Sequence, residues 1–328
     1  MSLTERPRRL RTSQAMRNLV AETVVLPSQL IYPTFIKENL IEPKPIKGLP
    51  GVFQNNEASL LAEVDRAIDA GIGGIMLFGI PAERDELGTA ACKPEGVLNK
   101  AVTAVRKRAG DKLVIVADLC LDEFTSHGHC GVLDDKGNVD NDATLITYGK
   151  MAVELAKAGA HMLGASGMMD GQVGYVRTEL DKAGFTEVSI LAYSAKYASA
   201  FYGPFRDAVE SELQGDRRTY QQDPRNFKES IREVRLDLEQ GADIVMVKPA
   251  LAYLDVIRET SQSVDVPVAA YIVSGEIAMI EVAVEQGLID RERAILEAVA
   301  SVRRAGASVI CTYWAFELAE MFYARKTL

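Results

Sequence analysis

Two lysines stand at the ends of predicted strands, where a charged side chain is unexpected. Lys248 ends the apolar run within "DIVMVKPALAY" (243–253), and Lys196 follows "SILAYSA" (189–195). Catalytic groups gather at the C-terminal ends of parallel strands, so these side chains are expected to face one cavity. Mutual repulsion and burial both lower a lysine pKa, and a neutral amine attacks a ketone to form a Schiff base. The pair predicts Schiff-base chemistry, and salt-bridged residues at the rim of the fold are the alternative.

Polar side chains also stand at or near the ends of other predicted strands. They are Asp118, Ser166, Tyr271, Ser274 and Tyr313. In a barrel these positions share one face, so the five side chains are expected to line the same cavity as the lysines.

The segment 194–224 is long for a connection between a strand and a helix. It is rich in Gly, aromatic and polar residues and carries Arg206, Arg217 and Arg218. Long ordered loops are often active-site lids, and arginine grips a carboxylate with two parallel hydrogen bonds. We therefore predict a lid that binds an anionic substrate, with a solvated charged loop as the alternative.

Potential metal ligands are concentrated in "ADLCLDEFTSHGHCG" (117–131). Cys120, Asp122, His127, His129 and Cys130 lie within eleven residues. The spacing is not that of a zinc finger, and two thiols with a carboxylate form a mixed ligand set. The segment predicts a metal site, and an ordinary polar loop is the alternative.

The elements that must position these residues alternate along the chain. Most predicted strands are near-continuous apolar runs, which is typical of parallel strands buried on both faces. Amphipathic helical stretches separate them, for example at 57–72, 143–160, 227–242 and 278–289. Eight strand–helix units predict a (β/α)₈ TIM barrel. A doubly wound sheet is the alternative, but no G-x-G-x-x-G follows the first strand. The predicted strands are 30–36, 74–80, 113–121, 161–166, 189–195, 243–248, 266–273 and 307–313.

Composition narrows the class of protein. The 328 residues are 48% hydrophobic and carry a net charge of −9, which disfavours nucleic-acid binding. No apolar run is long enough to span a bilayer, and the basic N-terminus lacks the features of a secretory signal. We therefore expect a cytoplasmic protein. Its four cysteines would then be reduced. Residues 1–28 lack a strand pattern and predict an extended arm with a short helix, or a disordered tail; residues 29–328 predict the barrel.

Several motifs together resemble the porphobilinogen synthase (5-aminolevulinate dehydratase) family. They are "GADIVMVKPALAY", "YSAKYASAFYGPFR", "SHGHCG" and "MMDGQVG", and the resemblance runs from the arginine-rich arm to the last helix. It implies a (β/α)₈ barrel whose arm wraps a neighbouring subunit, usually in a homo-octamer. The implied reaction, in tetrapyrrole and heme synthesis, condenses two 5-aminolevulinate molecules into porphobilinogen with loss of two waters.

The resemblance also implies roles for individual residues. Lys248 would hold the first substrate as a Schiff base, and Lys196 would engage the second. Arg206 and Arg217 would bind the carboxylate of the second substrate. Ser274 and Tyr313 would bind the carboxylate of the first substrate, and Asp118 and Ser166 would lie near the amino end of the second.

This chain departs from the family pattern at two places. Zinc-dependent members carry three cysteines in the loop, but Asp122 replaces the middle one while Cys120 and Cys130 remain. An active-site Zn²⁺ is therefore doubtful. Gly167 stands where the family commonly has an aspartate. Glu233 matches the glutamate that holds an activating Mg²⁺ through waters, so we expect Mg²⁺ to stimulate the enzyme there and zinc to be dispensable.

Two other functions fit parts of this pattern. A class I aldolase-type barrel also uses a lysine Schiff base, but it needs one lysine and leaves the paired carboxylate-binding groups unexplained. An inactive barrel that acts as a scaffold would not need the lysine pair or the lid arginines.

Overall fold

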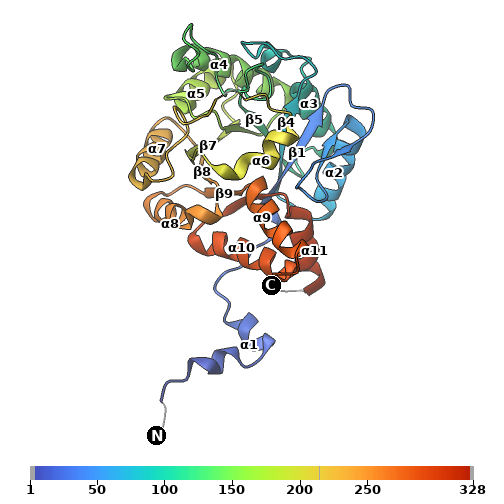
Figure 1. The fold of residues 1–328 in the computed structure, drawn as a ribbon, viewed down its shortest axis with the longest axis vertical. Coiled ribbons are helices and arrows are strands. Elements are labelled where there is room, and N and C mark those ends of the chain that lie inside the picture. Colours follow the sequence, from blue (N-terminus) through green and yellow to red (C-terminus); the bar gives the residue numbers. More distant parts are fainter. Residues whose placement is uncertain (1–3, 214, 326–328) are drawn as a thin grey trace.

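The computed structural model of the chain describes residues 4–213 and 215–325. Residues 1–3 of the predicted arm, and residues 214 and 326–328 of the predicted barrel range, lie outside this description. The described residues form a barrel surrounded by helices, with a short helical segment at the N-terminal side (Figure 1).

Eight parallel strands close into a barrel, which confirms the predicted fold. The hydrogen-bonded order is β10-β9-β8-β7-β6-β5-β4-β1, and β10 pairs back with β1. The strands bury both faces, as in β4, where all seven residues are buried. Each predicted strand is present: β1 Leu30–Lys37, β4 Gly74–Ile80, β5 Val114–Leu119, β6 Met162–Ala165, β7 Ser189–Lys196, β8 Ile244–Lys248, β9 Val268–Ile272 and β10 Val309–Thr312.

The helices that surround the barrel begin and end at residues suited to those positions. Asp140 caps α4 by accepting from the backbone N–H of Ala143, and Gly159 ends that helix with φ 104°. No described helix is both long enough and apolar enough to cross a membrane. The larger helices are α2 Glu57–Asp69, α3 Val97–Ala109, α4 Asn141–Ala158, α5 Gln172–Lys182, α7 Phe227–Glu239, α8 Leu254–Ser263, α9 Ser274–Glu285, α10 Arg291–Ala305 and α11 Ala315–Arg325.

Two details differ from the sequence-based expectation. A small antiparallel pair, β2 Lys44–Pro45 and β3 Phe53–Asn55, was not predicted and extends the sheet beside β1. Lys196 is the last residue of β7 rather than the residue after it. Because β7 includes Lys196, its backbone is fixed by the sheet and not by the flexible start of a loop.

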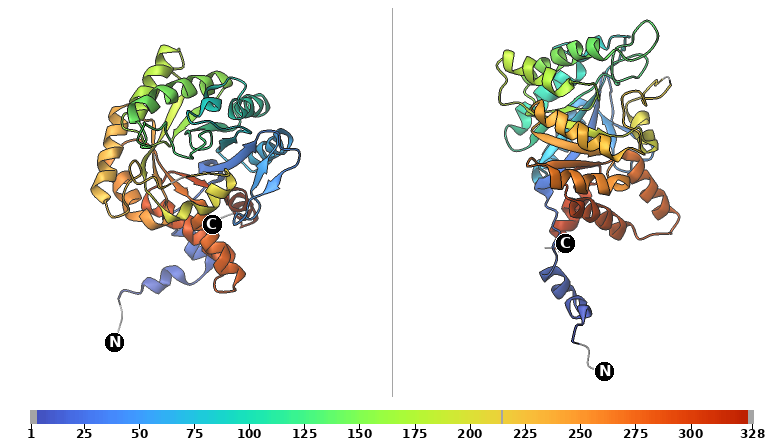
Figure 2. Two further views of the ribbon diagram at one scale, coloured as in Figure 1. Left: turned by 45° about the horizontal axis from the view of Figure 1, so that its top comes forward. Right: turned by 90° about the vertical axis from the view of Figure 1, so that its left-hand side faces the viewer.

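The N-terminal segment lies apart from the barrel. It contains a short 3₁₀-helix, Pro7–Arg11, and the helix α1, Gln14–Leu19, and no residue of either is buried. Three views show this segment projecting away from the barrel (Figures 1 and 2). Leu10 and Leu19 are 51% and 79% exposed, so this segment leaves apolar side chains in solvent.

Candidate active site

The sheet register places the two lysines side by side. Lys196 at the end of β7 pairs with Lys248 at the end of β8. Their side chains are 5% and 6% exposed and line one narrow cavity. The cavity is also lined by Phe78, Asp118, Asp122, Glu123, Ser166, Tyr202, Phe205, Arg206 and Arg217. The structure therefore brings together most of the polar residues singled out in the sequence.

Lys248 sits among aromatic rings. Its Nζ lies 4.3 Å from the ring centre of Tyr271, 5.0 Å from that of Tyr193, 5.4 Å from that of Phe205 and 5.6 Å from that of Tyr202. Burial, and then repulsion from Lys196, lower the pKa of Lys248 to about 8. About a tenth of this amine is therefore neutral at pH 7, far more than for an ordinary lysine, and a nucleophile requires the neutral form.

Lys196 sits among polar groups, and the predicted direction of its pKa shift is wrong. Its Nζ donates to the backbone oxygen of Ser166 at 2.5 Å. Burial would lower its pKa, but the sulfur atoms of Cys130 and Cys120 and the Asp122 carboxylate favour the charged form and raise it. The two lysines therefore share a register, but the pKa of Lys248 is lowered and that of Lys196 is raised.

Asp118 and Ser166 form a hydrogen-bonded pair beside Lys196. The Ser166 hydroxyl donates to Asp118 Oδ1 at 2.9 Å, and both residues are buried. Burial, and then the Asp122 carboxylate, raise the pKa of Asp118 to about 7. Asp118 is thus able to hold or release a proton in the range where the lysines work.

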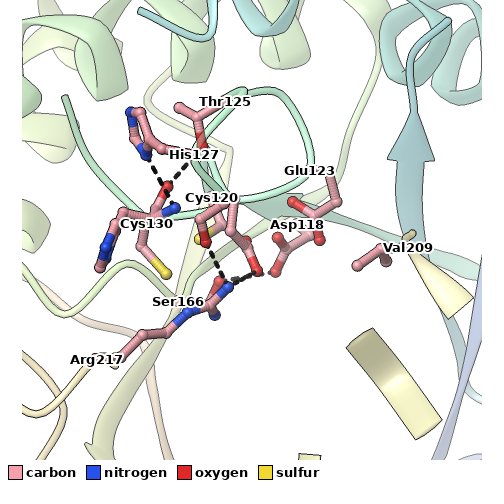
Figure 3. A network of polar contacts seen from close by, with 12 residues as sticks. Asp118, Cys120, Glu123, Thr125, His127, Cys130, Ser166, Val209 and Arg217 are labelled. Atoms are coloured by element: carbon pink, nitrogen blue, oxygen red, sulfur yellow. Dashed lines mark hydrogen bonds and ion pairs between the residues drawn. The ribbon is translucent and has the colours of Figure 1, made fainter. Parts of the chain in front are cut away.

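The two lid arginines occupy different environments. Arg217 is 8% exposed and donates to Asp122 Oδ2 at 2.9 Å and to the Gly128 oxygen at 2.8 Å (Figure 3). Arg206 lies on α6, Gly203–Ala208, and is exposed. Burial of its inner part, and then the Arg217 charge, lower the pKa of Arg206. Arg218, by contrast, is exposed and lies 3.7 Å from Asp216.

The middle of the lid is fastened to the barrel by side chains that the sequence analysis did not identify. Arg84 donates to the backbone oxygens of Glu123, Val209 and Glu210 at 2.8, 2.6 and 2.6 Å. Glu210 has φ +51° and pairs with Lys37 at 2.5 Å. These contacts join the lid to the loop that carries the cysteines, so the two segments are positioned together.

Ser274, Tyr271 and Tyr313 lie on the aromatic side of the site. The Tyr271 hydroxyl donates a hydrogen bond to the Tyr313 hydroxyl at 3.2 Å. Ser274 is the first residue of α9, and its Oγ accepts from the backbone N–H of Phe205 at 3.0 Å. The Tyr271 ring lies 4.3 Å from Lys248 Nζ, but Tyr271, Ser274 and Tyr313 are not among the residues that line the lysine cavity, where the sequence analysis expected them.

Cys120, Asp122 and Cys130 converge in the loop after β5. Potential ligand atoms of these three buried residues lie within 4.8 Å of one another. His127 and His129 face other partners: the Glu86 oxygen lies 3.1 Å from His127 Nε2, and the Tyr220 hydroxyl lies 3.0 Å from His129 Nδ1. The structure therefore retains the mixed thiol and carboxylate set and gives the histidines a structural role.

Comparison with known proteins identifies the family. The family model described as delta-aminolevulinic acid dehydratase matches residues 4–321. The chain belongs to this family. It is 57% identical over 316 residues to the Streptomyces coelicolor dehydratase, which covers 96% of both chains, and 46% identical over 318 residues to the Escherichia coli dehydratase, which covers 97% and 98%.

A solved structure of the family has the same fold. It is the Toxoplasma gondii delta-aminolevulinic acid dehydratase (porphobilinogen synthase), in complex with the reaction product porphobilinogen. The match has a TM-score of 0.95 at 43% identity and covers 98% of this chain and 92% of the other. The resemblance stated from the sequence motifs is thus confirmed.

Glu233 does not line the cavity that Lys196 and Lys248 share; it lines a separate one. It is half-buried on α7, and the surrounding cavity includes Asp170, Glu229 and lid residues 218–223. Burial, and then the charges of Asp237, Asp170 and Glu229, raise the pKa of Glu233. Its site is acidic and borders the lid, but it is separate from the catalytic cavity.

The structure explains how the chain accommodates Gly167 at the position where the family commonly has an aspartate. A Cβ atom at position 167 would collide with the hydroxyl of Tyr148 and would lie 2.8 Å from Gln172 Oε1. That Tyr148 hydroxyl donates to the backbone oxygen of Cys130 and lies 3.8 Å from Cys120 Sγ. Tyr148 therefore occupies the space of the missing side chain and buttresses the cysteine loop.

Sequence reasoning also missed Glu123 and the aromatic lining of the cavity. Glu123 is 1% exposed and directly follows Asp122. Tyr202 and Phe205 come from the motif "YASAFYGPFR"; the segment was noted as rich in aromatic residues, but these two were not assigned to the cavity. In the sequence, the adjacent acidic residues Asp122 and Glu123 and the repeated aromatic residues of this motif were the signals that could have identified them.

Proposed function

We infer that this chain condenses two molecules of 5-aminolevulinate into one of porphobilinogen and releases two water molecules. It is a lyase of tetrapyrrole and heme biosynthesis. The observation that carries the inference is the register pairing of Lys196 with Lys248 over one buried cavity, in a chain of this family. Two amines suit two ketone substrates, whereas an aldolase-type reaction needs one.

Lys248 forms the Schiff base with the first substrate in this proposal. Its neutral amine adds to the ketone carbon, and the carbinolamine then loses water as the C=N bond forms. The pKa of about 8 and the aromatic walls support this role, because they favour the neutral amine and exclude bulk water. The positively charged imine then acidifies the adjacent carbon, so that a carbon–carbon bond can form.

Lys196 engages the second substrate, whose amino end lies near Asp118 and Ser166. The hydrogen bond between Asp118 and Ser166, and the Lys196 contact with the Ser166 oxygen, support a shared polar subsite. Asp118, with its pKa of about 7, is suited to exchange a proton with the amino group or with Lys196. Holding both substrates in this one cavity promotes ring closure by proximity.

The substrate carboxylates are bound at opposite sides of the cavity. Arg206 and Arg217 on the lid bind that of the second substrate, because guanidinium groups bind carboxylates through charge-assisted hydrogen bonds. Ser274 and Tyr313 bind that of the first substrate, near Lys248. The lid position of the arginines and the aromatic contacts around Lys248 support this division.

A zinc or magnesium ion fits the loop after β5. Cys120, Asp122 and Cys130 would hold it, since their ligand atoms converge and the pKa of Cys130 falls to about 7. Burial would raise that pKa, but Cys120 and Arg217 favour the thiolate. A bound ion would supply a positive charge beside the second substrate.

A separate Mg²⁺ at Glu233 is proposed to activate the enzyme by ordering the lid and a subunit interface. The neighbouring carboxylates and the lid residues along this cavity support it. Activity of metal-stripped enzyme should return with Mg²⁺, and zinc should be dispensable. Glu233→Ala should lose the response, whereas Glu239→Ala, exposed on the same helix, should keep it. Recovery with Zn²⁺ alone, or an unchanged response of Glu233→Ala, would contradict this assignment.

We further propose a homo-oligomer, an octamer by family resemblance, in which residues 1–28 wrap a neighbouring subunit. The exposed apolar side chains of Leu10 and Leu19 support a partner surface on this segment. Mass measurement of the full chain and of a chain lacking residues 1–28 tests it. The cytoplasmic location stays a prediction from the composition.

The decisive experiment is a colour assay for porphobilinogen with 5-aminolevulinate as the substrate. Formation of porphobilinogen, with two substrates consumed per product, is the expected result. An aldolase-type enzyme would trap a substrate on lysine without making this product. A scaffold would do neither, and either of these results would overturn the proposed function.

A further inference from the structure

Strand β7 holds one residue more than a regular ladder with β8 allows. Ala192 and Ala195 are three positions apart, whereas their partners in β8, Val245 and Val247, are two positions apart. Such a shift is a β-bulge, in which an extra residue of one strand lacks a partner and the backbone bends. The bulge lies directly before Lys196, the last residue of β7. It is therefore placed to set the direction of the Lys196 side chain.

The bulge turns Lys196 toward the cavity. Side chains of a regular strand alternate between its two faces, so residues three positions apart point to opposite faces. Tyr193 points into the barrel, because its ring centre lies 5.6 Å from Lys196 Nζ and 5.0 Å from Lys248 Nζ. Ser194 points outward and hydrogen-bonds to Asp237 of α7. In a regular strand Lys196 would share the outward face of Ser194, but the extra residue brings it to the face of Tyr193.

Gln222, near the end of the lid, is bonded to this bulge. Its Nε2 donates to the backbone oxygen of Ser194 at 3.0 Å, and its Oε1 accepts from the Ser230 hydroxyl of α7 at 2.6 Å. Its backbone N–H donates to the Lys196 oxygen at 3.0 Å, and its backbone oxygen accepts from the Ala198 N–H at 2.9 Å. Gln222 is 4% exposed. This buried residue therefore bonds the segment that carries Lys196 on both sides of the lysine.

We propose that Gln222 is a positioning residue, which holds the β7 bulge so that Lys196 faces the cavity. A bulge interrupts the ladder, and a buried carbonyl oxygen without a donor is unfavourable. The Gln222 amide supplies the donor for the buried Ser194 oxygen. That oxygen can only accept, so the nitrogen end of the amide must face it. Ser230, which is also buried, bonds the other end of the amide and fixes its orientation.

The expected consequence is confined to the second substrate. Lys196 engages that substrate in the proposed function, and the catalytic importance of Gln222 rests on that function. If the bulge relaxes, Lys196 loses the geometry in which its Nζ donates to the Ser166 oxygen. Lys248 belongs to β8 and lies among aromatic rings, so its Schiff base should still form. Loss of Gln222 should therefore separate the first step of the reaction from the later ones.

The test compares Gln222→Met with Gln240→Met in the full chain. Methionine keeps the length of the side chain and removes both amide hydrogen bonds of Gln222. Gln240 is the control, because it accepts from the backbone N–H of Gly174 at 3.0 Å and does not line the lysine cavity. The measurements are hydrogen exchange of residues 194–198 by mass spectrometry, borohydride trapping of 5-aminolevulinate on Lys248, and porphobilinogen formation.

In Gln222→Met we expect exchange of residues 194–198 to be about fivefold faster or more, because the bulge opens more often. Trapping on Lys248 should stay within about twofold of the unmodified enzyme, and porphobilinogen formation should fall by about tenfold or more, since misplacement of a catalytic group slows the reaction. Gln240→Met should change none of the three. A fold that was merely destabilised would lose trapping and product formation together.

Three outcomes for Gln222→Met would overturn the proposal: unchanged exchange, unchanged porphobilinogen formation, or an equal fall in trapping and product formation. Thermal unfolding checks that each variant is folded. Should Gln222→Met not fold, Ser230→Ala takes its place with the same direction of change, because it frees one end of the Gln222 amide. If the unmodified chain made no porphobilinogen, the proposed function would fail, and exchange of residues 194–198 would still decide whether Gln222 holds the bulge.

Discussion

The surroundings of Lys248 and Lys196 differ although the two residues are partners in the same sheet register. The Lys248 side consists of tyrosine and phenylalanine rings, and the Lys196 side consists of carboxylates, thiols and a backbone oxygen. Burial is similar on both sides, so it does not explain their opposite pKa shifts. The difference comes from the neighbouring charges: Lys196 has anionic partners that outweigh its burial, and Lys248 has mainly the repulsion of Lys196.

This division teaches that a lysine pair need not be a pair of equivalent nucleophiles. The aromatic side prepares a neutral amine, which suits the first Schiff base. The polar side keeps an ammonium group, which suits binding and proton transfer and can attack a second substrate only after it gives up a proton. One cavity thus treats two identical substrates differently.

The largest expected effect comes from removing either lysine. Lys248→Met should lower turnover by roughly 10³-fold or more and abolish borohydride trapping of 5-aminolevulinate, because the neutral amine is lost. Lys196→Met should also lose turnover but should still form the adduct on Lys248. Peptide mapping by mass spectrometry locates the adduct. If the adduct in the unmodified enzyme were found only on lysines other than Lys248, the proposed difference in role between Lys248 and Lys196 would be wrong.

The loss of substrate binding on removing a lid arginine should be larger for the more buried of the two. Arg217→Ala should weaken binding of the second substrate by about 100-fold and Arg206→Ala by about tenfold, since a hydrogen bond to a charged group contributes roughly 1.5–3 kcal/mol. Binding of the first substrate should change less in both. The dependence of rate on substrate concentration measures this.

Arg218→Ala is the matched control on the same lid, because Arg218 is exposed and faces Asp216. It should leave the concentration dependence unchanged. Equal effects of all three alanine variants would show that lid charge, and not the placement of Arg206 and Arg217, determines binding.

A third test follows the pH dependence of Schiff-base formation. The Lys248 pKa lies near 8, so the neutral fraction is about a tenth at pH 7 and rises as the pH passes through 8. The rate of trapping should rise over the same interval and level off above it. In Lys196→Met the midpoint should move upward, because one cause of the depressed pKa is removed. A midpoint near 10 in the unmodified enzyme would contradict the role given to burial and to Lys196.

The smallest expected effect concerns the aromatic wall. Tyr271→Phe keeps the ring whose centre lies 4.3 Å from Lys248 Nζ and removes only the hydroxyl bonded to Tyr313. The pH midpoint should therefore stay within about 0.3 units, since burial is retained. Tyr271→Ala admits water and should raise the midpoint. If both variants had the same midpoint and it differed from that of the unmodified enzyme, the effect would come from the hydroxyl and not from the ring.

Sequence reasoning was most successful where the signal was local. The apolar runs predicted the eight barrel strands, and their ends placed Lys248 and Asp118 in one cavity. The β2–β3 pair was missed because it is two and three residues long and includes Pro45. A strand this short has no periodic pattern to detect.

Properties that depend on distant neighbours could not be read from the sequence. The pKa shift of Lys196 depends on Cys120 and Cys130. These two residues lie in the loop after β5 and come close to Lys196 only in the folded chain. Glu123 was missed because its significance lies in its burial at the cavity wall, and a glutamate beside an aspartate does not show this in the sequence. Folding determines these neighbours, so residue type alone predicts only which groups are available.

The contact between Gly167 and Tyr148 limits which side chains these two positions can hold together. An aspartate cannot enter position 167 while the Tyr148 hydroxyl fills that space, and a glycine there beside a smaller residue at 148 would leave a void next to Cys130. Neither single exchange is neutral, so the two positions should change together or not at all. A Gly167→Asp variant of this chain should therefore be destabilised unless Tyr148 is replaced by a smaller residue as well.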